Sequence, residues 1–108
     1  MWMDGDAAII DHSIDLRFVI AASPPSANML ISEDAWQTVG EGSSNTGVFL
    51  ARVNDFSRNL MEAWYRAAEQ PDLAKHKKDH PWEQGVFNKG MWGRYETIHR
   101  FPFCWLFG

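Results

Sequence analysis

The segment NTGVFLARVNDFSRNLMEAWYRAAEQP, residues 45–71, holds the clearest strand pattern and the clearest helix pattern of the chain. Residues 47–53 are a mostly apolar run that follows a polar loop, which predicts a β-strand. A helix is predicted next, because Asn54 or Asp55 suits an N-cap and Pro71 ends the pattern. Its apolar positions recur at helical spacing: Phe56, Leu60, Met61, Trp64, Ala67 and Ala68. A strand that leads directly into an amphipathic helix indicates an α/β domain.

Shorter elements are predicted on both sides of this segment. Towards the N-terminus, residues 2–3 are expected to close a buried strand, and the apolar runs 17–22 (RFVIAA) and 28–32 (NMLIS) each predict a short strand. Towards the C-terminus, residues 81–90 (PWEQGVFNKG) predict a second helix that has proline in its first turn and glycine at its end. Residues 94–101 (RYETIHRF) alternate as a strand does. The expected architecture is α/β, a short mixed sheet with two main helices.

Composition limits what this chain can be. Its 108 residues, 45% hydrophobic and 22% charged, suit one ordinary globular domain. The net charge of −4 and the lack of a basic stripe argue against nucleic-acid binding. A single cysteine, Cys104, excludes an intrachain disulfide and a cysteine zinc site. No apolar run approaches the ~20 residues of a membrane span. Because the chain begins in an expected strand and stops on the apolar run FPFCWLFG, we expect a piece of a larger protein.

Asp4 and Asp6 form an acidic pair directly after the first expected strand. Carboxylates at a buried strand end cost free energy unless they are hydrogen-bonded, paired or bound to a cation. The pair suits a hard divalent cation that also bridges a substrate diphosphate. It also suits an aspartate-based phosphatase, with Asp4 as nucleophile and Asp6 as general acid, for which Lys89 and residues 33–34 would have to supply the further groups. An acidic turn without function is the third alternative, and the pair alone leaves all three open.

Two further polar motifs are candidates for the same site. Asn45 in the Asn-Thr-Gly sequence has an amide that suits sugar hydroxyls, and Gly47 allows close approach of the backbone. An ordinary turn from loop to strand explains the same residues. Glu83 and Gln84 open the second helix and would face a pocket, with Trp82 as a flat apolar surface. The alternative is that the helix dipole alone favours a carboxylate in the first turn.

The stretches WMDGDAAIID, NTGVFLARVNDFSRNLMEAWYRAAEQP and HPWEQGVFN, in this order, resemble a known family. It is the galactosyl-, mannosyl- and xylosyltransferase family, which includes yeast α-1,2-galactosyltransferases, α-1,6-mannosyltransferases and plant xyloglucan xylosyltransferases. That family has a strand ending in Asp-x-Asp, an Asn-x-Gly before a strand, a Trp-containing amphipathic helix and an acidic-Gln pair opening a later helix. The resemblance covers most of the chain and is loosest over residues 17–42.

The resemblance implies a GT-A fold and a nucleotide-sugar-dependent glycosyltransferase that retains anomeric configuration. Such an enzyme uses manganese or another divalent cation to transfer a hexose or pentose to a glycan or glycoprotein acceptor. It implies a Golgi or secretory-lumen location for a full-length eukaryotic parent. Residues 1–108 would form a single partial domain that lacks the N-terminal nucleotide-binding half, so the activity would belong to the parent domain. The alternative on the same core is a non-catalytic remnant or a carbohydrate-binding module.

The resemblance also assigns roles to particular residues. Asp4 and Asp6 would be the metal ligands, with Asp4 also near the donor ribose. The implied substrate-binding residues are Asp4, Asn45, Gly47 and Trp82, and the implied catalytic residues are Glu83 and Gln84. The family has a later histidine that completes the metal site, but His99 in IHRFPF does not match its context, so this role is not transferred.

Overall fold

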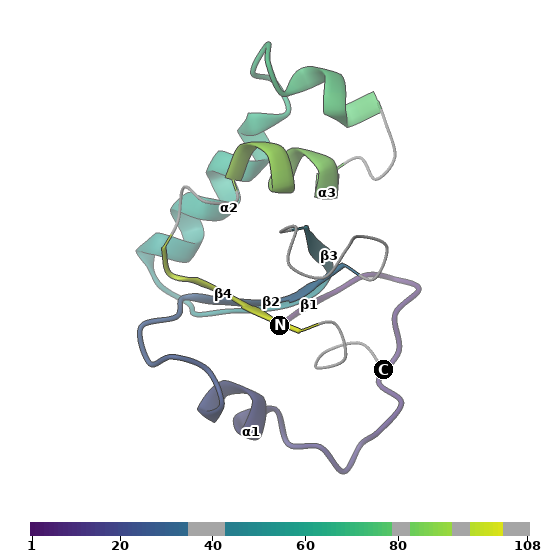
Figure 1. The fold of residues 1–108 in the computed structure, drawn as a ribbon, viewed down its shortest axis with the longest axis vertical. Helices are drawn as coiled ribbons and strands as arrows, with labels where there is room; N and C mark the ends of the chain where they lie inside the picture. Colours follow the sequence, from purple (N-terminus) through teal and green to yellow (C-terminus); the bar gives the residue numbers. More distant parts are fainter. Residues whose placement is uncertain (35–42, 79–82, 92–95, 103–108) are drawn as a thin grey trace.

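The computed structural model describes residues 1–34, 43–78, 83–91 and 96–102, which fold into a four-stranded mixed sheet with short helices (Figure 1). The elements are, in chain order, β1 (Trp2–Met3), α1 (Leu16–Ala21), β2 (Met29–Glu33), β3 (Ser44–Ala51), α2 (Asp55–Ala67), the 3₁₀ helix η1 (Ala74–Lys78), α3 (Glu83–Val86), the π-helical turn η2 (Phe87–Met91) and β4 (Ile98–Phe101). The expected mixed α/β architecture is therefore confirmed.

Strand direction decides which loops meet. The sheet order is β1-β3-β2-β4, with β3 antiparallel to both β1 and β2, and β4 parallel to β2. Consequently β1, β2 and β4 all run the same way, and β3 runs against them. The carboxyl ends of β1 and β2 therefore lie at the same edge of the sheet as the start of β3. We call this edge the site edge.

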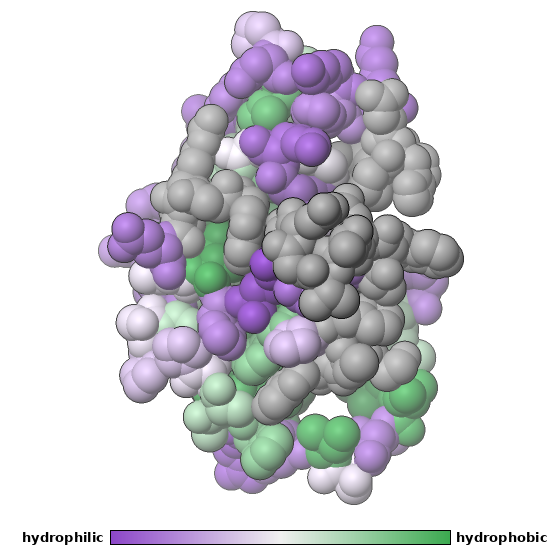
Figure 2. All heavy atoms as spheres, viewed as in Figure 1, coloured by the Kyte–Doolittle hydropathy of each residue, from purple (hydrophilic) through white to green (hydrophobic). Residues whose placement is uncertain are grey.

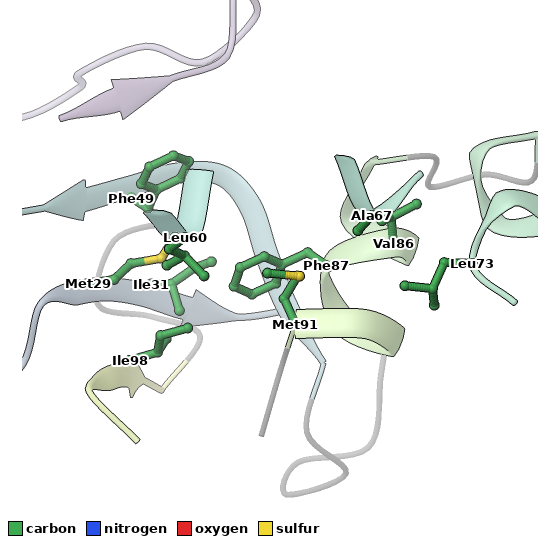
Figure 3. Close-up of a cluster of buried hydrophobic side chains, with 10 residues drawn as sticks. All are labelled: Met29, Ile31, Phe49, Leu60, Ala67, Leu73, Val86, Phe87, Met91 and Ile98. Carbon is green, nitrogen blue, oxygen red and sulfur yellow. The ribbon is translucent and has the colours of Figure 1, made fainter. Parts of the chain in front are cut away.

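Each face of the sheet packs on one apolar cluster, and the two clusters differ in size. Helices α2 and α3 cover one face and α1 covers the other (Figure 1). The larger cluster lies between the sheet, α2 and α3 (Figure 3): Met29, Ile31, Phe49, Leu60, Ala67, Leu73, Val86, Phe87, Met91 and Ile98. The smaller cluster lies under α1 and contains Val19, Ala27, Leu30 and Phe101. Most of the apolar burial that stabilises the fold is therefore on the α2 side.

Helix α2 forms for the reasons that the sequence indicates. The Asn54 side chain accepts a hydrogen bond from the Ser57 backbone N–H (3.0 Å), which caps the helix at the expected residue. The buried face carries Leu60 and Ala67, and Phe56, Met61 and Trp64 pack against the larger cluster. The helix ends at Ala67, a few residues before Pro71. The helix predicted from apolar spacing is thus confirmed.

The strand predicted at residues 17–22 is wrong, because this run forms helix α1. The Asp15 side chain caps the helix by accepting from the Arg17 backbone N–H (2.8 Å). Hydrogen bonds from the Arg17 side chain and backbone also lower the pKa of the Asp15 carboxyl below its ordinary value. Only Val19 of α1 is buried. The periodicity of such a short apolar run does not distinguish a strand from a helix, so the Asp15 cap is the feature that indicates a helix.

The remaining elements lie near their predicted places with shifted bounds. Strand β2 confirms the run 28–32. Strand β3 begins and ends earlier than the expected 47–53, and β4 lies within the expected 94–101, of which residues 94–95 are outside the described residues. The second helix is split into α3 and the π-helical η2. Strand β1 forms as expected, but it is an exposed edge strand rather than a buried one.

The sheet face covered by α1 buries few apolar side chains, and many apolar residues in this part of the chain are exposed. Apolar atoms gather on the surface around α1, in the lower part of the view in Figure 2. The exposed large apolar residues in the first part of the chain are Met1, Trp2, Met3, Ile9, Ile10, Ile14, Leu16, Phe18 and Ile20. No helix in the described part of the chain is long and apolar enough to cross a membrane.

We expect Leu60→Ala to lower the free energy of unfolding by about 2–5 kcal/mol, because it leaves a cavity in the larger cluster. Leu60 is fully buried at 0% exposure between α2 and the sheet. Urea denaturation followed by circular dichroism measures the change. Val53→Ala is the control, since Val53 is 90% exposed and should lose about 0.5 kcal/mol or less. Equal effects of the two substitutions would contradict the assigned core.

Candidate functional site

Residues that are far apart in the sequence meet at the site edge. Asp4 follows β1, and its backbone N–H donates to the Gly47 carbonyl of β3 (2.8 Å). Glu83 opens α3, and its carboxylate lies 3.4 Å from the Thr46 hydroxyl. The acidic motif, the Asn-Thr-Gly motif and the Glu-Gln motif are therefore in contact with one another through Thr46 and Gly47.

Gly47 is where the Asp4 side chain approaches the backbone of β3. A Cβ atom built on Gly47 would lie 3.1 Å from Asp4 Oδ2 and 3.0 Å from Asn45 Oδ1, closer than ordinary contacts. The Asn45 Oδ1 atom in turn accepts from the Gly47 backbone N–H (2.8 Å). Glycine is thus the residue that lets both polar side chains lie against this backbone.

The Asn-Thr-Gly motif lies at a break in the register of the sheet. Phe49 pairs with Ile31, whereas Asn45 pairs with Ser32, so residues 46–48 of β3 lie opposite a single step of β2. Such bulges bend a strand and redirect its side chains, and they are common beside active sites. On its other side the same segment pairs with β1, where Val48 lies opposite Met3.

Two amide side chains from α3 and η2 hold the start of β3. Gln84 is buried, and its Oε1 accepts from the Thr46 N–H (3.0 Å) while its Nε2 donates to Asp34 Oδ2 (2.7 Å). Asn88 Oδ1 accepts from the Ser44 N–H (2.7 Å), and Asn88 Nδ2 donates to the Ser44 carbonyl (2.9 Å). These bonds pair backbone and carboxylate groups that would otherwise be costly to bury.

Three residues at the site edge have no role in the site that the resemblance implies, although the phosphatase alternative includes Asp34. Asp34 follows β2 as Asp4 follows β1, so the signal that indicated Asp4 also applies to Asp34. Asn88 lies four positions after Gln84, the spacing that places two side chains on one helical face. Thr46 is the middle residue of the Asn-Thr-Gly motif, and it connects Glu83 and Gln84 to β3. No pattern in the sequence indicates this link.

Glu83 and Asp4 both line one pocket on the α2 side of the sheet. Its volume is about 210 Å³, and it is lined by Trp2, Asp4, Thr46, Phe49, Met61, Trp64 and Glu83. The indole N–H of Trp64 donates to the Glu83 carbonyl (3.1 Å), which ties the start of α3 to α2. We call this cavity the aromatic pocket.

The other predicted site residues stand apart from this pocket. Asp6 is exposed in the turn that follows Asp4, and it is not among the pocket-lining residues. Trp82 lies outside the described residues. Within the residues that the structure describes, no group of three or more His, Cys, Asp or Glu side chains is arranged to hold a metal ion. Any cation at Asp4 and Asp6 would need further oxygen ligands from a substrate or from elsewhere.

We expect Gln84→Glu to lower the free energy of unfolding by about 1–3 kcal/mol near neutral pH, because it places a carboxylate against Asp34 Oδ2. Repulsion between two carboxylates raises the pKa of the introduced group. The loss is therefore full above that raised pKa and shrinks below it, where the protonated group donates to Asp34.

Urea denaturation of the variant and the wild type near neutral and acidic pH measures this difference. Glu83→Gln, at the adjacent exposed position, is the control and should change stability by about 0.5 kcal/mol or less. A Gln84→Glu variant as stable as the wild type near neutral pH would contradict the assigned bond between Gln84 and Asp34.

Comparison with known proteins identifies no relative of this chain. No family model matches the chain, and neither a curated protein nor a solved structure matches it. The chemistry of the site edge is therefore the basis for a function.

Proposed function

We propose that this chain is the metal-binding and acceptor-side part of a nucleotide-sugar-dependent glycosyltransferase domain of the GT-A type. The observation that carries the proposal is the convergence at the site edge. The Asp-x-Asp, Asn-x-Gly and Glu-Gln motifs lie far apart in the sequence, and each is a candidate for the same site on its residue types. Hydrogen bonds connect all three motifs through Thr46 and Gly47. If each motif were only a local turn or helix start without function, these contacts between the motifs would not be expected.

The donor atoms at Asp4 and Asp6 suit a hard divalent cation such as Mn²⁺. Both groups are carboxylates at the end of a strand, and Asp6 is exposed to solvent. Hard cations prefer oxygen ligands and commonly combine one or two carboxylates with substrate phosphates. When bound, the cation would neutralise negative charge on the departing diphosphate.

The residues of the chain divide into those that would face substrate and those that position them. Glu83 is exposed at the aromatic pocket, so its carboxylate is available to accept a proton or a hydrogen bond from a sugar hydroxyl. Gln84 is buried, and its amide bonds to Thr46 and Asp34, which suits a positioning role. Asn45 and Gly47 hold the strand against which Asp4 lies.

The phosphatase alternative receives less support from the surroundings of Asp4. Such enzymes need a cationic side chain to hold the phosphoryl group beside the nucleophile. Among the described residues, those that line the pocket beside Asp4 include no lysine or arginine. Lys89 is exposed in η2 and is not part of that lining.

We expect UDP or GDP to bind this chain in the presence of Mn²⁺, and we expect Asp4→Asn and Asp6→Ala each to weaken that binding. A loss of about tenfold or more in affinity, equal to ~1.4 kcal/mol, is expected for each variant. The reason is that each substitution removes a negatively charged oxygen ligand. Isothermal titration calorimetry with and without EDTA is the measurement.

Asp72→Asn is the matched control, because Asp72 is an exposed aspartate in the turn after α2, outside the pocket. It should leave the affinity unchanged. Absence of Mn²⁺-dependent binding of both nucleotides, or full affinity in Asp6→Ala, would overturn the proposed metal site.

A further inference from the structure

The aromatic pocket has one apolar side and one polar rim. Three aromatic rings and a methionine supply the apolar side, namely Trp2, Phe49, Trp64 and Met61. The polar groups of the lining are the carboxylates of Asp4 and Glu83 and the hydroxyl of Thr46. At about 210 Å³ the cavity is smaller than the roughly 300–1,000 Å³ of pockets for drug-sized ligands. It therefore suits a single small ring.

The Trp2 ring is held in place before any ligand arrives. It stacks on Phe49 with an interplanar angle of 15° and a centroid distance of 6.1 Å. Its indole N–H donates to Asp4 Oδ1 (3.2 Å). Because Trp2 is 54% exposed, much of the ring remains open to solvent beside the Asp4 carboxylate. A flat apolar surface next to a hydrogen-bond acceptor is thus preorganised.

The Trp64 ring is held beside Glu83 through the backbone of that residue. Its indole N–H donates to the Glu83 carbonyl, and the ring packs on Phe87 with a centroid distance of 4.7 Å. Phe49 lies between the two tryptophans, 6.1 Å from each ring centre. Each acidic residue of the pocket therefore accepts a hydrogen bond from one indole, Asp4 through its carboxylate and Glu83 through its backbone carbonyl.

The charge of the rim decides what kind of ring fits. Asp4 and Glu83 are acceptors when ionised, and both repel an anionic group. Without a bound cation, a diphosphate or a carboxylate ligand is therefore disfavoured in this pocket. A ligand with several hydroxyl donors around an apolar C–H face matches both the rim and the rings. A neutral pyranose has this chemistry.

We infer that the aromatic pocket binds a neutral pyranose ring without the help of a metal ion. The hydroxyls of the ring donate to Asp4 and Glu83, and its C–H face packs on the aromatic side. The inference deepens the proposed function and rests on it only for the identity of the ring, which is either the donor sugar or the acceptor sugar. The binding itself uses only residues of this chain.

The test is a titration of the chain with methyl glycosides of glucose, galactose, mannose and xylose in the presence of EDTA. Tryptophan fluorescence and saturation-transfer NMR are the readouts. We expect saturable binding of at least one glycoside, with contacts mainly to the C–H protons of one ring face. The uronic acid analogue of that glycoside carries a carboxylate and should bind at least fivefold more weakly.

Variants separate this pocket from non-specific binding. Trp2→Ala and Glu83→Gln should each weaken binding by fivefold or more, whereas Trp2→Phe keeps a ring and should retain part of the affinity. Tyr65→Ala is the matched control, because Tyr65 is an aromatic residue of α2 that is 83% exposed and does not line the pocket. Thermal unfolding of each variant checks that the fold is intact.

Each outcome bears on the inference. The absence of saturable glycoside binding in EDTA, or full affinity in folded Trp2→Ala, overturns it. If the bound glycoside is displaced by a nucleotide sugar with Mn²⁺, the ring is that of the donor, and simultaneous binding identifies the acceptor. Glycoside binding in EDTA without any Mn²⁺-dependent nucleotide binding supports the pocket while the proposed glycosyltransferase site fails. Mn²⁺-dependent nucleotide binding without glycoside binding in EDTA rejects the inferred pyranose pocket and leaves the proposed glycosyltransferase site standing.

Discussion

The bond between the buried Gln84 amide and the start of β3 is the interaction on which the site edge depends. Strand β1 pairs with β3 only at Val48 and Phe49, so within the described residues it supplies no backbone partner for the N–H groups of Ser44 and Thr46. Buried backbone donors must nevertheless be paired. Gln84 and Asn88 provide those partners from one helical face, so the short α3 and η2 act as a substitute for a neighbouring strand.

This substitution couples the pocket to the hydrophobic core. The amides can reach β3 only because Val86 and Phe87, on the same short helices, are buried in the larger cluster. Trp64 adds a second connection, since its ring packs on Phe87 while its indole N–H bonds to Glu83. Apolar packing therefore determines where the polar groups of the site lie.

The predictable parts of the fold were those with a local physical cause. Helix α2 followed from the Asn54 cap and the apolar spacing, and both are local signals. The strand predicted at residues 17–22 is wrong because a run of five apolar residues after Arg17 suits either a strand or a helix, and the Asp15 cap decides for the helix. The prediction that β1 is buried is also wrong. Whether a strand lies at the edge or in the centre of a sheet depends on how the strands are ordered, and the sequence of the strand alone does not determine it.

The candidate site was predictable only as separate motifs. Asp4, Asn45, Gly47, Glu83 and Gln84 were each identified from their residue types, and the structure brings these five together. The bulge at residues 46–48 and the link from Gln84 to Asp34 depend on the relative directions of three strands. Neither periodicity nor motif spacing contains that information.

The shortness of β1 has a consequence for cooperativity within the molecule. Asp4 follows a two-residue strand that, among the described residues, pairs only with β3 and lies at an edge of the sheet. Such segments open locally at a much lower free energy than the core does. A ligand that engages Asp4 would therefore also protect the β1 amides from hydrogen exchange. Ligand binding and the pairing of β1 with β3 would then be thermodynamically coupled, so a measurement of either would report on the other.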